Sequence, residues 1–444
     1  MESKYKVSII MPSLNVVNYI DECMKSVLVQ TLYEKEIICI DAGSTDGTWE
    51  KLLFYASAYK DKVSILLFQC EIKSYGYQVN IGIRAATGKY IAILETDDYV
   101  DQDMYNQLYN VAETNNVDFV KADYDSFVSY SENRKIFNNI RFFKNEKYKY
   151  NTVINPRKNI YLYINDHTIW RGIYKREFLL NNNILLNESK GAAFQDIGFS
   201  LQVLSTAKRA IFVDKSFYRY RLNREHSSIN SINGLKYSYW EFSWLLENDI
   251  LGKKLIYRDG VYASLVQTFC FELIKALRAE NYNADSEYIK PYYIWFRNQI
   301  LNSINKKALN IDLFQLHPQL HSILDNIYDF SLKLKCEDIA LKEKKERLLH
   351  SVKGKKIIIF GLGAYGNSLM EYLYNYDINI HALCDNNAAL WNTEKHSLPV
   401  YSPTECTRLF PDNTYIVANK NNSQDIRKQL LDLGINEKNI CIYL

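Results

Sequence analysis

The first hundred residues alternate between short apolar runs and segments with helical spacing, and this alternation most constrains the fold. Four apolar runs read as strands, and in the segments between them apolar residues recur three or four positions apart. Strands joined by helices pair in parallel through right-handed crossovers, so we expect an α/β sheet with helices on its faces. The predicted strands cover residues 7–11, 36–41, 63–68 and 91–94.

Polar side chains follow three of these strands at the point where each strand ends. They are Ser13 and Asn15 after the first strand, Asp41 at the end of the second, and Glu95, Asp97 and Asp98 after the fourth. In parallel sheets, ligands bind beyond the carboxyl ends of the strands. The sequence therefore predicts that these groups converge on one crevice, with a nucleotide-like ligand.

The acidic cluster after the fourth strand predicts a bound cation. Glu95, Asp97 and Asp98 repel one another and cost desolvation free energy unless positive charge lies beside them. A divalent metal that carries a phosphorylated ligand is the natural partner. The alternative is a helix start, because aspartates are also favoured at helix N-termini. Taken with the rest of the chain, the metal interpretation is favoured.

Five motifs in this order resemble the family 2 glycosyltransferases with the GT-A fold. The resemblance covers roughly residues 5 to 230, and its motifs are VSIIMPSLN (7–15), SVLVQT (26–31), IDAGSTDGT (40–48), NIG (80–82) and ETDD (95–98). It implies an inverting transferase that uses a nucleoside-diphosphate sugar, usually linked to UDP, together with Mg²⁺ or Mn²⁺. The implied α/β catalytic domain spans residues 1–232.

The resemblance also implies roles for individual residues. Glu95-x-Asp97 stands where the family has D-x-D, so one or both of Asp97 and Asp98 are expected to bind metal and diphosphate. An Arg is common just before Asn80, and Val79 stands there instead. Lys73, Tyr75 and Gln78 are candidates to replace it. The expected donor-binding residues are Pro12, Ser13, Asn15, Asp41, Lys73, Tyr75, Gly76, Gln78, Asn80, Glu95, Thr96, Asp97, Trp170 and His226.

Several of these residues have ordinary structural alternatives. Trp170 is expected either to offer its ring to a sugar face or to pack in the core. The segment 217–221 and His226 resemble a loop near the donor diphosphate, with Arg219, Arg221 or His226 as contacts. A single histidine is more often structural, and that alternative stays open for His226.

Asp196 is the predicted general base. The segment 191–199 resembles the family's acidic motif that supplies this base, and Asp196 is the acid within an otherwise uncharged apolar stretch. Burial there would raise the pKa of its carboxyl towards a useful value. The alternative is an acid that complements the dipole at the start of a helix.

The rest of the chain predicts a helical region over residues 233–350 and a second α/β unit over 351–444. Gly361, Gly363 and Gly366 follow a strand and open a helix, and Asp385 lies about 20 residues on, as in dinucleotide-binding folds. The unit has about half the length of such a fold. It resembles small Rossmann-like domains appended to bacterial surface-polysaccharide enzymes. Either a bound nucleotide or nucleotide sugar, or a structural and protein-contact role, fits it.

Charge and cysteine usage narrow the setting. A net charge of +3 does not indicate nucleic-acid binding. Eight cysteines without a C-x-x-C pair, no signal-peptide segment and no long uncharged apolar run predict a cytosolic protein. The basic and aromatic residues at 134–144 fit either an anionic acceptor or lipid surface, or a solvated hairpin. Peripheral contact with the inner face of the membrane and homo-oligomerisation remain open.

The leading prediction is an inverting glycosyltransferase of bacterial surface-polysaccharide synthesis. It would move a sugar from a UDP-hexuronic acid, UDP-hexose or UDP-N-acetylhexosamine to a hydroxyl of an oligosaccharide or lipid-linked saccharide acceptor. One alternative is an NAD(P)-dependent sugar-nucleotide dehydrogenase or epimerase working through the Gly361 unit, where no Tyr-x-x-x-Lys is found. Another is a non-catalytic protein that binds sugar nucleotides.

Overall fold

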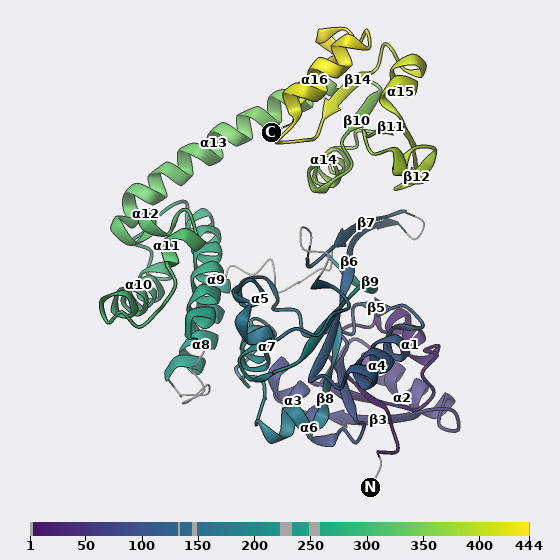
Figure 1. Cartoon of the computed structure of the whole chain (residues 1–444), viewed down its shortest axis with the longest axis vertical. Helices are drawn as coiled ribbons and strands as arrows, with labels where there is room; N and C mark the ends of the chain where they lie inside the picture. The colour runs from purple at the N-terminus through teal and green to yellow at the C-terminus, as the bar shows by residue number, and fades with distance from the viewer. Residues whose placement is uncertain (1–2, 132–133, 144–148, 223–232, 248–257, 444) are drawn as a thin grey trace. The chain divides into compact units, whose positions relative to one another are not determined.

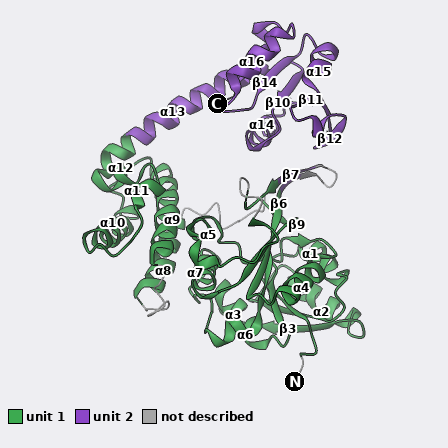
Figure 2. Cartoon of the chain, viewed as in Figure 1, with its two compact units in different colours: residues 1–126, 139–332 green, residues 127–138, 333–444 purple. Residues whose placement is uncertain are grey.

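The computed structural model describes residues 3–131, 134–143, 149–222, 233–247 and 258–443. The chain forms two compact units, shown in Figure 2. The first unit contains residues 1–126 and 139–332, and the second contains 127–138 and 333–444.

The first sheet is mixed and, within the described residues, has nine strands (Figure 1). Its order is β3-β2-β1-β4-β8-β6-β9-β5, with β7 paired to β6. Its strands are β1 (Val7–Ser13), β2 (Lys35–Asp41), β3 (Ser64–Gln69), β4 (Tyr90–Ile93), β5 (Tyr99–Val100), β6 (Phe119–Ser131), β7 (Arg134–Ile140), β8 (Gly172–Lys175) and β9 (Ala210–Arg221).

The helices before residue 210 connect or flank these strands. They are α1 (Ile20–Leu28), α2 (Thr48–Ala58), α3 (Tyr75–Ala85), α4 (Met104–Asn115), α5 (Ile160–Asn165), α6 (Arg176–Asn181) and α7 (Gln195–Thr206). The alternation of β1 to β4 with α1 to α3 agrees with the pattern expected from the sequence, and these four strands are parallel. Helix α3 begins at Tyr75, two residues before the predicted start, because the Ser74 side chain accepts a hydrogen bond from the Tyr77 N–H.

The two faces of the parallel strands are covered by different helices. Odd-numbered residues of β1, such as Ile9, belong to a core cluster with residues of α1, α2 and α4. Ile10 faces the other way, and a Cβ on Gly82 of α3 would come within 2.4 Å of it. This three-layer packing leaves the carboxyl ends of the strands at one edge, where the polar residues lie.

The expectation of a wholly parallel sheet was incomplete. β8 pairs with β4 and with β6 in antiparallel fashion, and β5 pairs with β9 in the same way. The sequence pattern did not reveal this half, because its strands do not alternate with long helices. The antiparallel half is what carries β9 next to the acidic strand end.

The next helices of the first unit pack on α7 and on one another. They are α8 (Gly234–Glu247), α9 (Arg258–Ala279), α10 (Ile289–Asn305), α11 (Leu313–Leu316) and α12 (Leu320–Asp325), and α13 (Ile327–Val352) follows. Within the helical region predicted over 233–350, α12 and α13 are divided at Asn326. Among the described helices, α9 is long and apolar enough to cross a membrane, although 67% of its apolar window is buried. A core helix meets the same criterion.

The second unit has its own sheet, with the order β12-β13-β11-β10-β14-β15 among the described residues. All its pairs are parallel except β12 with β13. Its elements are β10 (Ile357–Phe360), α14 (Ala364–Tyr374), β11 (Ile380–Cys384), β12 (Thr393–Lys395), β13 (Leu398–Tyr401), α15 (Pro403–Leu409), β14 (Thr414–Val417), α16 (Ser423–Asp432) and β15 (Ile440–Ile442).

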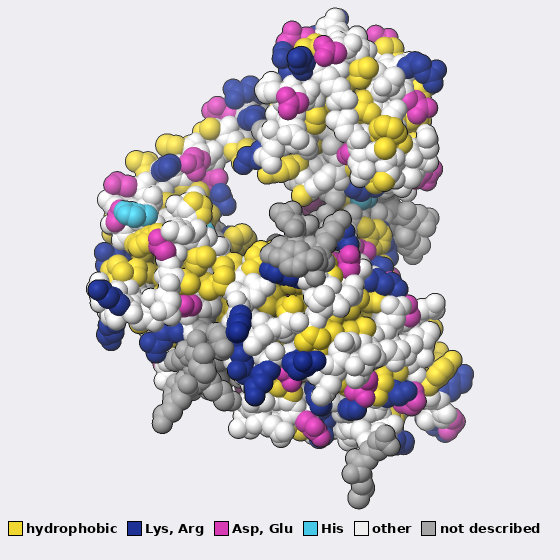
Figure 3. Space-filling model, viewed as in Figure 1, with side chains coloured by type: hydrophobic (Ala, Val, Ile, Leu, Met, Phe, Trp, Pro, Cys, Tyr) yellow, Lys and Arg dark blue, Asp and Glu magenta, His cyan; other side chains and the backbone are white. Residues whose placement is uncertain are grey.

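The basic and aromatic segment forms a hairpin, but most of its described side chains are partly or fully buried, which differs from the solvated hairpin that one interpretation expected. β7 pairs with β6, and Ile136 is buried in the same cluster as Val352, Ile357 and Leu369 of the second unit. The Asn367 Nδ2 also donates to Asn138 Oδ1 at 3.0 Å. On the face drawn in Figure 3, basic and acidic side chains are interspersed.

Candidate active site

Asp41 organises the turn that follows β2. Its side chain is fully buried, and it accepts hydrogen bonds from the N–H of Gly43 and Ser44 and from the Ser44 hydroxyl. Asn15 is joined to the same turn, since its Oδ1 accepts from Thr45 N at 2.9 Å. The two strand ends therefore form one rigid rim, as the sequence predicted. The hydrogen bonds of the Asp41 carboxylate named here come from its own loop, and its contact with a nucleoside stays a prediction.

Two residues of α3 that were predicted to bind the sugar donor make hydrogen bonds to other parts of the chain. The Gln78 amide donates to the carbonyl oxygens of Ser13 and Ile40 at 2.9 and 2.7 Å. The Asn80 amide exchanges hydrogen bonds with the backbone of Leu186 and also donates to Glu188. Gln78 is 5% exposed and Asn80 is 1% exposed. Both side chains position neighbouring segments, and their expected contact with the donor stays a prediction.

The start of α3 is fastened to the segment before α7. Tyr75 N donates to Gly191 O, and Gly191 N donates to Lys73 O, each at 2.9 Å. A Cβ on Gly76 would lie 1.9 Å from the carbonyl oxygen of Asn187, so only glycine allows this approach. The Tyr75 hydroxyl donates to Glu95 Oε1. Lys73 itself is exposed.

The acidic cluster after β4 divides into residues with different surroundings. Asp98 is 2% exposed, and its two carboxylate oxygens accept from the Tyr218 hydroxyl at 2.8 Å and from Arg221 N at 2.7 Å. Burial and then the charge of Asp97 raise the pKa of Asp98 well above its usual value. Glu95 and Asp97 are only partly buried. Asp97 is therefore the more accessible of the two predicted metal ligands.

Thr96 and Pro12 link the first and fourth strand ends, and Trp170 fills the space beneath. The Thr96 hydroxyl donates to Pro12 O at 2.8 Å, and Thr96 and Ser13 are buried. The Trp170 ring is 6% exposed and stacks on Tyr220, with centroids 5.1 Å apart. Of the two interpretations of Trp170, core packing is what the structure shows.

β9 contributes residues that the sequence did not single out for these roles. Tyr218 holds Asp98, as above. Arg221 donates through Nε to Asp97 O at 3.0 Å and pairs with Glu22. The sequence signal for these residues was the run of alternating aromatic and basic residues at 217–221, which was expected near the donor diphosphate. Arg219 instead pairs with Asp101 and Asp125. His226 lies outside the described residues.

Asp196 lies in the first turn of α7 and is partly exposed. Burial raises the pKa of its carboxyl to about 6, against the lowering effects of the Ile197 N–H and of Lys121. Lys121 is itself buried and bonded to Asp166 at 2.8 Å, beside the equally buried Arg171. A carboxyl of this kind is ionised near neutral pH and remains basic enough to accept a proton.

The acidic strand end and Asp196 lie close enough to act on the same two tyrosines. After burial, the charges of Asp98, Asp97, Glu95 and Asp196 all raise the pKa of Tyr220. Glu95 and Asp196 likewise both raise the pKa of Tyr75. The structure thus brings together, around two tyrosines, carboxylates that are about 100 positions apart in the chain.

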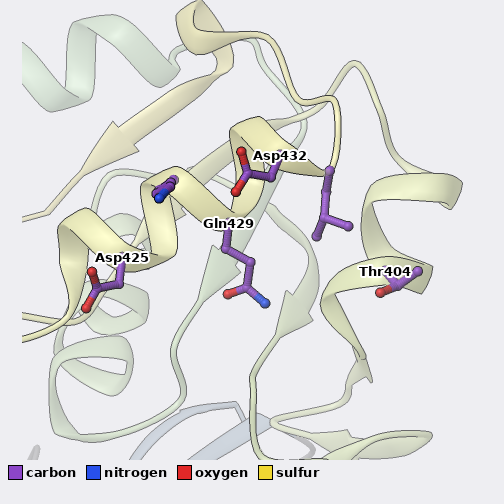
Figure 4. A pocket seen from close by; sticks show the side chains of 6 residues that line it. Thr404, Asp425, Gln429 and Asp432 are labelled. Carbon is purple, nitrogen blue, oxygen red and sulfur yellow. The ribbon is translucent and has the colours of Figure 1, made fainter.

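The glycine turn of the second unit has a different arrangement. Gly361 has a φ of +104°, and a Cβ on Gly366 would lie 2.1 Å from Gly361 O. Asp385 accepts from Leu362 N and Asn387 N, each at 2.8 Å. A cavity of about 210 Å³ lies at the ends of β10, β11 and β14. A neighbouring open hollow of about 420 Å³ includes Thr404, Asp425, Gln429 and Asp432 (Figure 4).

Comparison with known proteins places the first unit. Residues 8–176 match the family model described as glycosyl transferase family 2. The chain is 32% identical over 258 residues to the cholesterol galactosyltransferase of Borreliella burgdorferi, which covers 55% of this chain and 69% of that protein. The chain belongs to glycosyl transferase family 2. This family 2 glycosyltransferase is also 27% identical to the uncharacterized glycosyltransferase YibD of Escherichia coli, over 63% of this chain and 80% of that protein.

A solved structure shares the fold. The crystal structure of S. aureus TarS residues 1–349, in complex with UDP-GlcNAc, covers 77% of this chain and 92% of that one. The TM-score is 0.52 at 18% identity, which shows a GT-A-like fold for the glycosyltransferase. Residues 353–441 match a second family model, described as C2185-like, N-terminal. The dehydrogenase and non-catalytic alternatives are not favoured by these findings.

Proposed function

We propose that the chain is an inverting glycosyltransferase that takes a hexosyl or N-acetylhexosaminyl group from a UDP-sugar. The observation that carries the proposal is the convergence of the strand-end carboxylates and Asp196 on Tyr75 and Tyr220. The strand-end carboxylates suit a nucleoside diphosphate that arrives with a divalent cation, and Asp196 suits the role of general base. One relative named above is a galactosyltransferase, and the solved structure with a similar fold was determined with UDP-GlcNAc; both support the proposal of a UDP-sugar donor.

In this mechanism Asp196 removes the proton from an acceptor hydroxyl. The acceptor oxygen then attacks the anomeric carbon from the face opposite the diphosphate, the bond from that carbon to the phosphate oxygen breaks, and UDP leaves with the electron pair. The product has the inverted anomeric configuration. A pKa of about 6 keeps Asp196 ionised at neutral pH, so that it is ready to accept the proton.

The residues present fit a divalent cation that arrives with the donor. Within the described part of the chain, no three His, Cys, Asp or Glu side chains are arranged to hold a metal alone. Mg²⁺ in nucleotide sites needs only one or two carboxylates besides the phosphates. Asp97 would hold the ion directly, and Asp98 would orient the cluster through Tyr218. Bound Mg²⁺ or Mn²⁺ supplies positive charge for the leaving diphosphate.

The acceptor is proposed to be a saccharide or lipid hydroxyl of a bacterial surface polymer, made at the cytosolic side of the membrane. A matching segment of 117 residues, 32% identical, belongs to the poly(ribitol-phosphate) beta-glucosyltransferase of Bacillus spizizenii. For the second unit we propose a small Rossmann-like module, with domain limits near residues 232 and 350. Its parallel strands and its glycine turn support this proposal.

The test is release of UDP from a panel of UDP-sugars, with Mn²⁺, with Mg²⁺ and with EDTA. Lipid extracts and oligosaccharides serve as acceptors, and the anomeric configuration of the product is read by NMR. We expect metal-dependent release of UDP and an inverted product. A retained configuration, or turnover of no nucleotide sugar at all, would overturn the proposal.

A further inference from the structure

A buried carboxyl from outside the matched family segment lies against the helix that carries Asp196. Glu241 belongs to α8, which packs on α7, and it is 1% exposed. A Cβ on Gly198 of α7 would lie 1.8 Å from Glu241 Oε1. The missing side chain at Gly198 therefore leaves a notch in α7, two residues after Asp196, and the Glu241 carboxyl fills it.

The partners of Glu241 are neutral. Asn187 Nδ2 donates to Glu241 Oε2 at 2.9 Å, while Oε1 is buried and lies against Gly198, whose N–H also acts on the carboxyl. An ionised carboxylate in this position would be costly, since no cation is paired with it. Burial raises the pKa of Glu241 to about 8, and the charge of Asp196 adds to this, whereas the hydrogen bonds from Asn187 and from the Gly198 N–H oppose it. The carboxyl is therefore neutral when Asp196 is ionised.

The groups that face Glu241 come from three directions. Asp196 is the charged group on α7, Asn187 comes from the preceding loop, and Trp244 of α8 also borders the notch. On α9, Glu272 pairs with Lys275 and lies against Gly234 instead. From α10, Tyr292 contacts Tyr239. The positive charge of Lys121, on β6, lowers the pKa of Asp196.

Asn187 extends this contact to the donor side. Its carbonyl oxygen packs against Gly76 of α3, the residue after Tyr75, and the Tyr75 hydroxyl bonds to Glu95. One residue, Asn187, thus touches both the helix at the donor side and the carboxyl that seats α7. The start of α7 has no side-chain cap of its own, so its placement depends on such contacts.

We propose that Glu241 is a positioning residue for the transfer reaction: its neutral carboxyl seats the first turn of α7 through Gly198 and Asn187 and thereby holds Asp196 towards the acceptor. This inference rests on the proposed role of Asp196 as base. When Glu241 ionises, a second buried negative charge appears beside Asp196 without a counter-ion. The contact of Glu241 with Gly198 and Asn187 then weakens, and turnover falls.

The test compares full-length wild type with Glu241→Gln, Glu241→Ala and the control Glu272→Gln, which removes a buried carboxyl on α9. Turnover and donor KM are measured from pH 6 to 9.5 by UDP release. We expect wild type and the control to lose turnover above about pH 8, and Glu241→Gln to keep it with neutral-pH turnover within about threefold. Glu241→Ala should lose tenfold or more in kcat with a smaller change in donor KM. An alkaline loss in Glu241→Gln equal to that of wild type would overturn the proposal.

Thermal unfolding supplies a measurement that does not require turnover. Because the folded pKa of Glu241 lies above the unfolded one, its ionisation costs stability that increases as pH rises from about 4.5 to 8. We expect the Tm of Glu241→Gln to exceed that of wild type by a margin that grows over this range. Burial also raises the pKa of Glu272, against its pairing with Lys275, so Glu272→Gln should show a smaller growth that ends at a lower pH. A Tm difference that stays constant with pH would overturn the claim that the Glu241 carboxyl is neutral, whether or not wild type releases UDP. Failure of wild type to release UDP would count only against the proposed function.

Discussion

Asp385 of the second unit differs in its surroundings from Asp98 and Asp196 of the first unit, and the difference bears on what each acid does. In the second unit, Asp385 accepts two backbone N–H groups and holds the Gly361 turn. In the first unit, Asp98 and Asp196 lie in surroundings that raise the pKa of each carboxyl. A carboxylate whose hydrogen bonds are met by its own loop stabilises the fold, whereas clustered or buried acids with raised pKa values are candidates for ligand binding or chemistry.

The largest effect should come from removing the base. Asp196→Asn keeps the shape of the side chain but cannot accept a proton, so we expect UDP release to fall about 10²- to 10⁴-fold. Asp385→Asn is the matched control at the strand end of the second unit and should stay within about threefold of wild type. The measurement is single-donor turnover under saturating acceptor. Equal losses in the two variants would erase the distinction between the two acids.

The pH dependence should sharpen the same distinction. The pKa of Asp196 is raised to about 6, and the reaction needs its ionised form. We therefore expect kcat/KM to decline about tenfold per pH unit below 6, in contrast to a group with the ordinary value near 4. Initial rates between pH 4.5 and 7.5 check this. A profile that stays flat down to pH 5 would show that Asp196 is not the titrating base.

Stability should change in opposite directions at the two sites. Because the folded pKa of Asp196 exceeds the unfolded value of 3.8, its ionisation opposes folding above that pH. Asp196→Asn should then stabilise the protein at pH 7 by no more than about 3 kcal/mol, reduced by the solvent that reaches the carboxyl. Asp385→Asn should destabilise the second unit by about 1–3 kcal/mol, since it weakens two charge-assisted hydrogen bonds. Urea unfolding of the full chain measures both.

The sequence predicted the parts of the fold that depend on local periodicity. The first four strands, the converging strand ends and the helix carrying Asp196 followed from spacing and from turn residues. The antiparallel pairing of β8 with β4 and β6, and of β9 with β5, could not be predicted, because strand neighbours far apart in the chain leave no local pattern. For the same reason Tyr218, which lies 120 positions from Asp98, was not identified as its partner.

Individual ligand roles were harder to predict than the crevice itself. Gln78 and Asn80 occupy positions expected for donor contacts, yet their amides bond to Ser13, Ile40 and Leu186. A side-chain amide suits a phosphate or a carbonyl equally well, and only the packed structure decides between them. Glu241 carried no signal either, since a glutamate in an amphipathic segment is ordinarily exposed.

The smallest effects should separate two glycines of the second unit. Gly361 has a left-handed φ of +104° and a Cβ there would lie 3.1 Å from Ala418 O, whereas Gly363 has no atom within 4 Å of a built Cβ. Gly361→Ala should lower the stability of the second unit by about 1–2 kcal/mol, and Gly363→Ala by less than about 0.5 kcal/mol. Neither should alter UDP release. If Gly363→Ala reduced transfer while stability stayed unchanged, the open space at this turn would have to serve the reaction, and the contrast between the two units would fail.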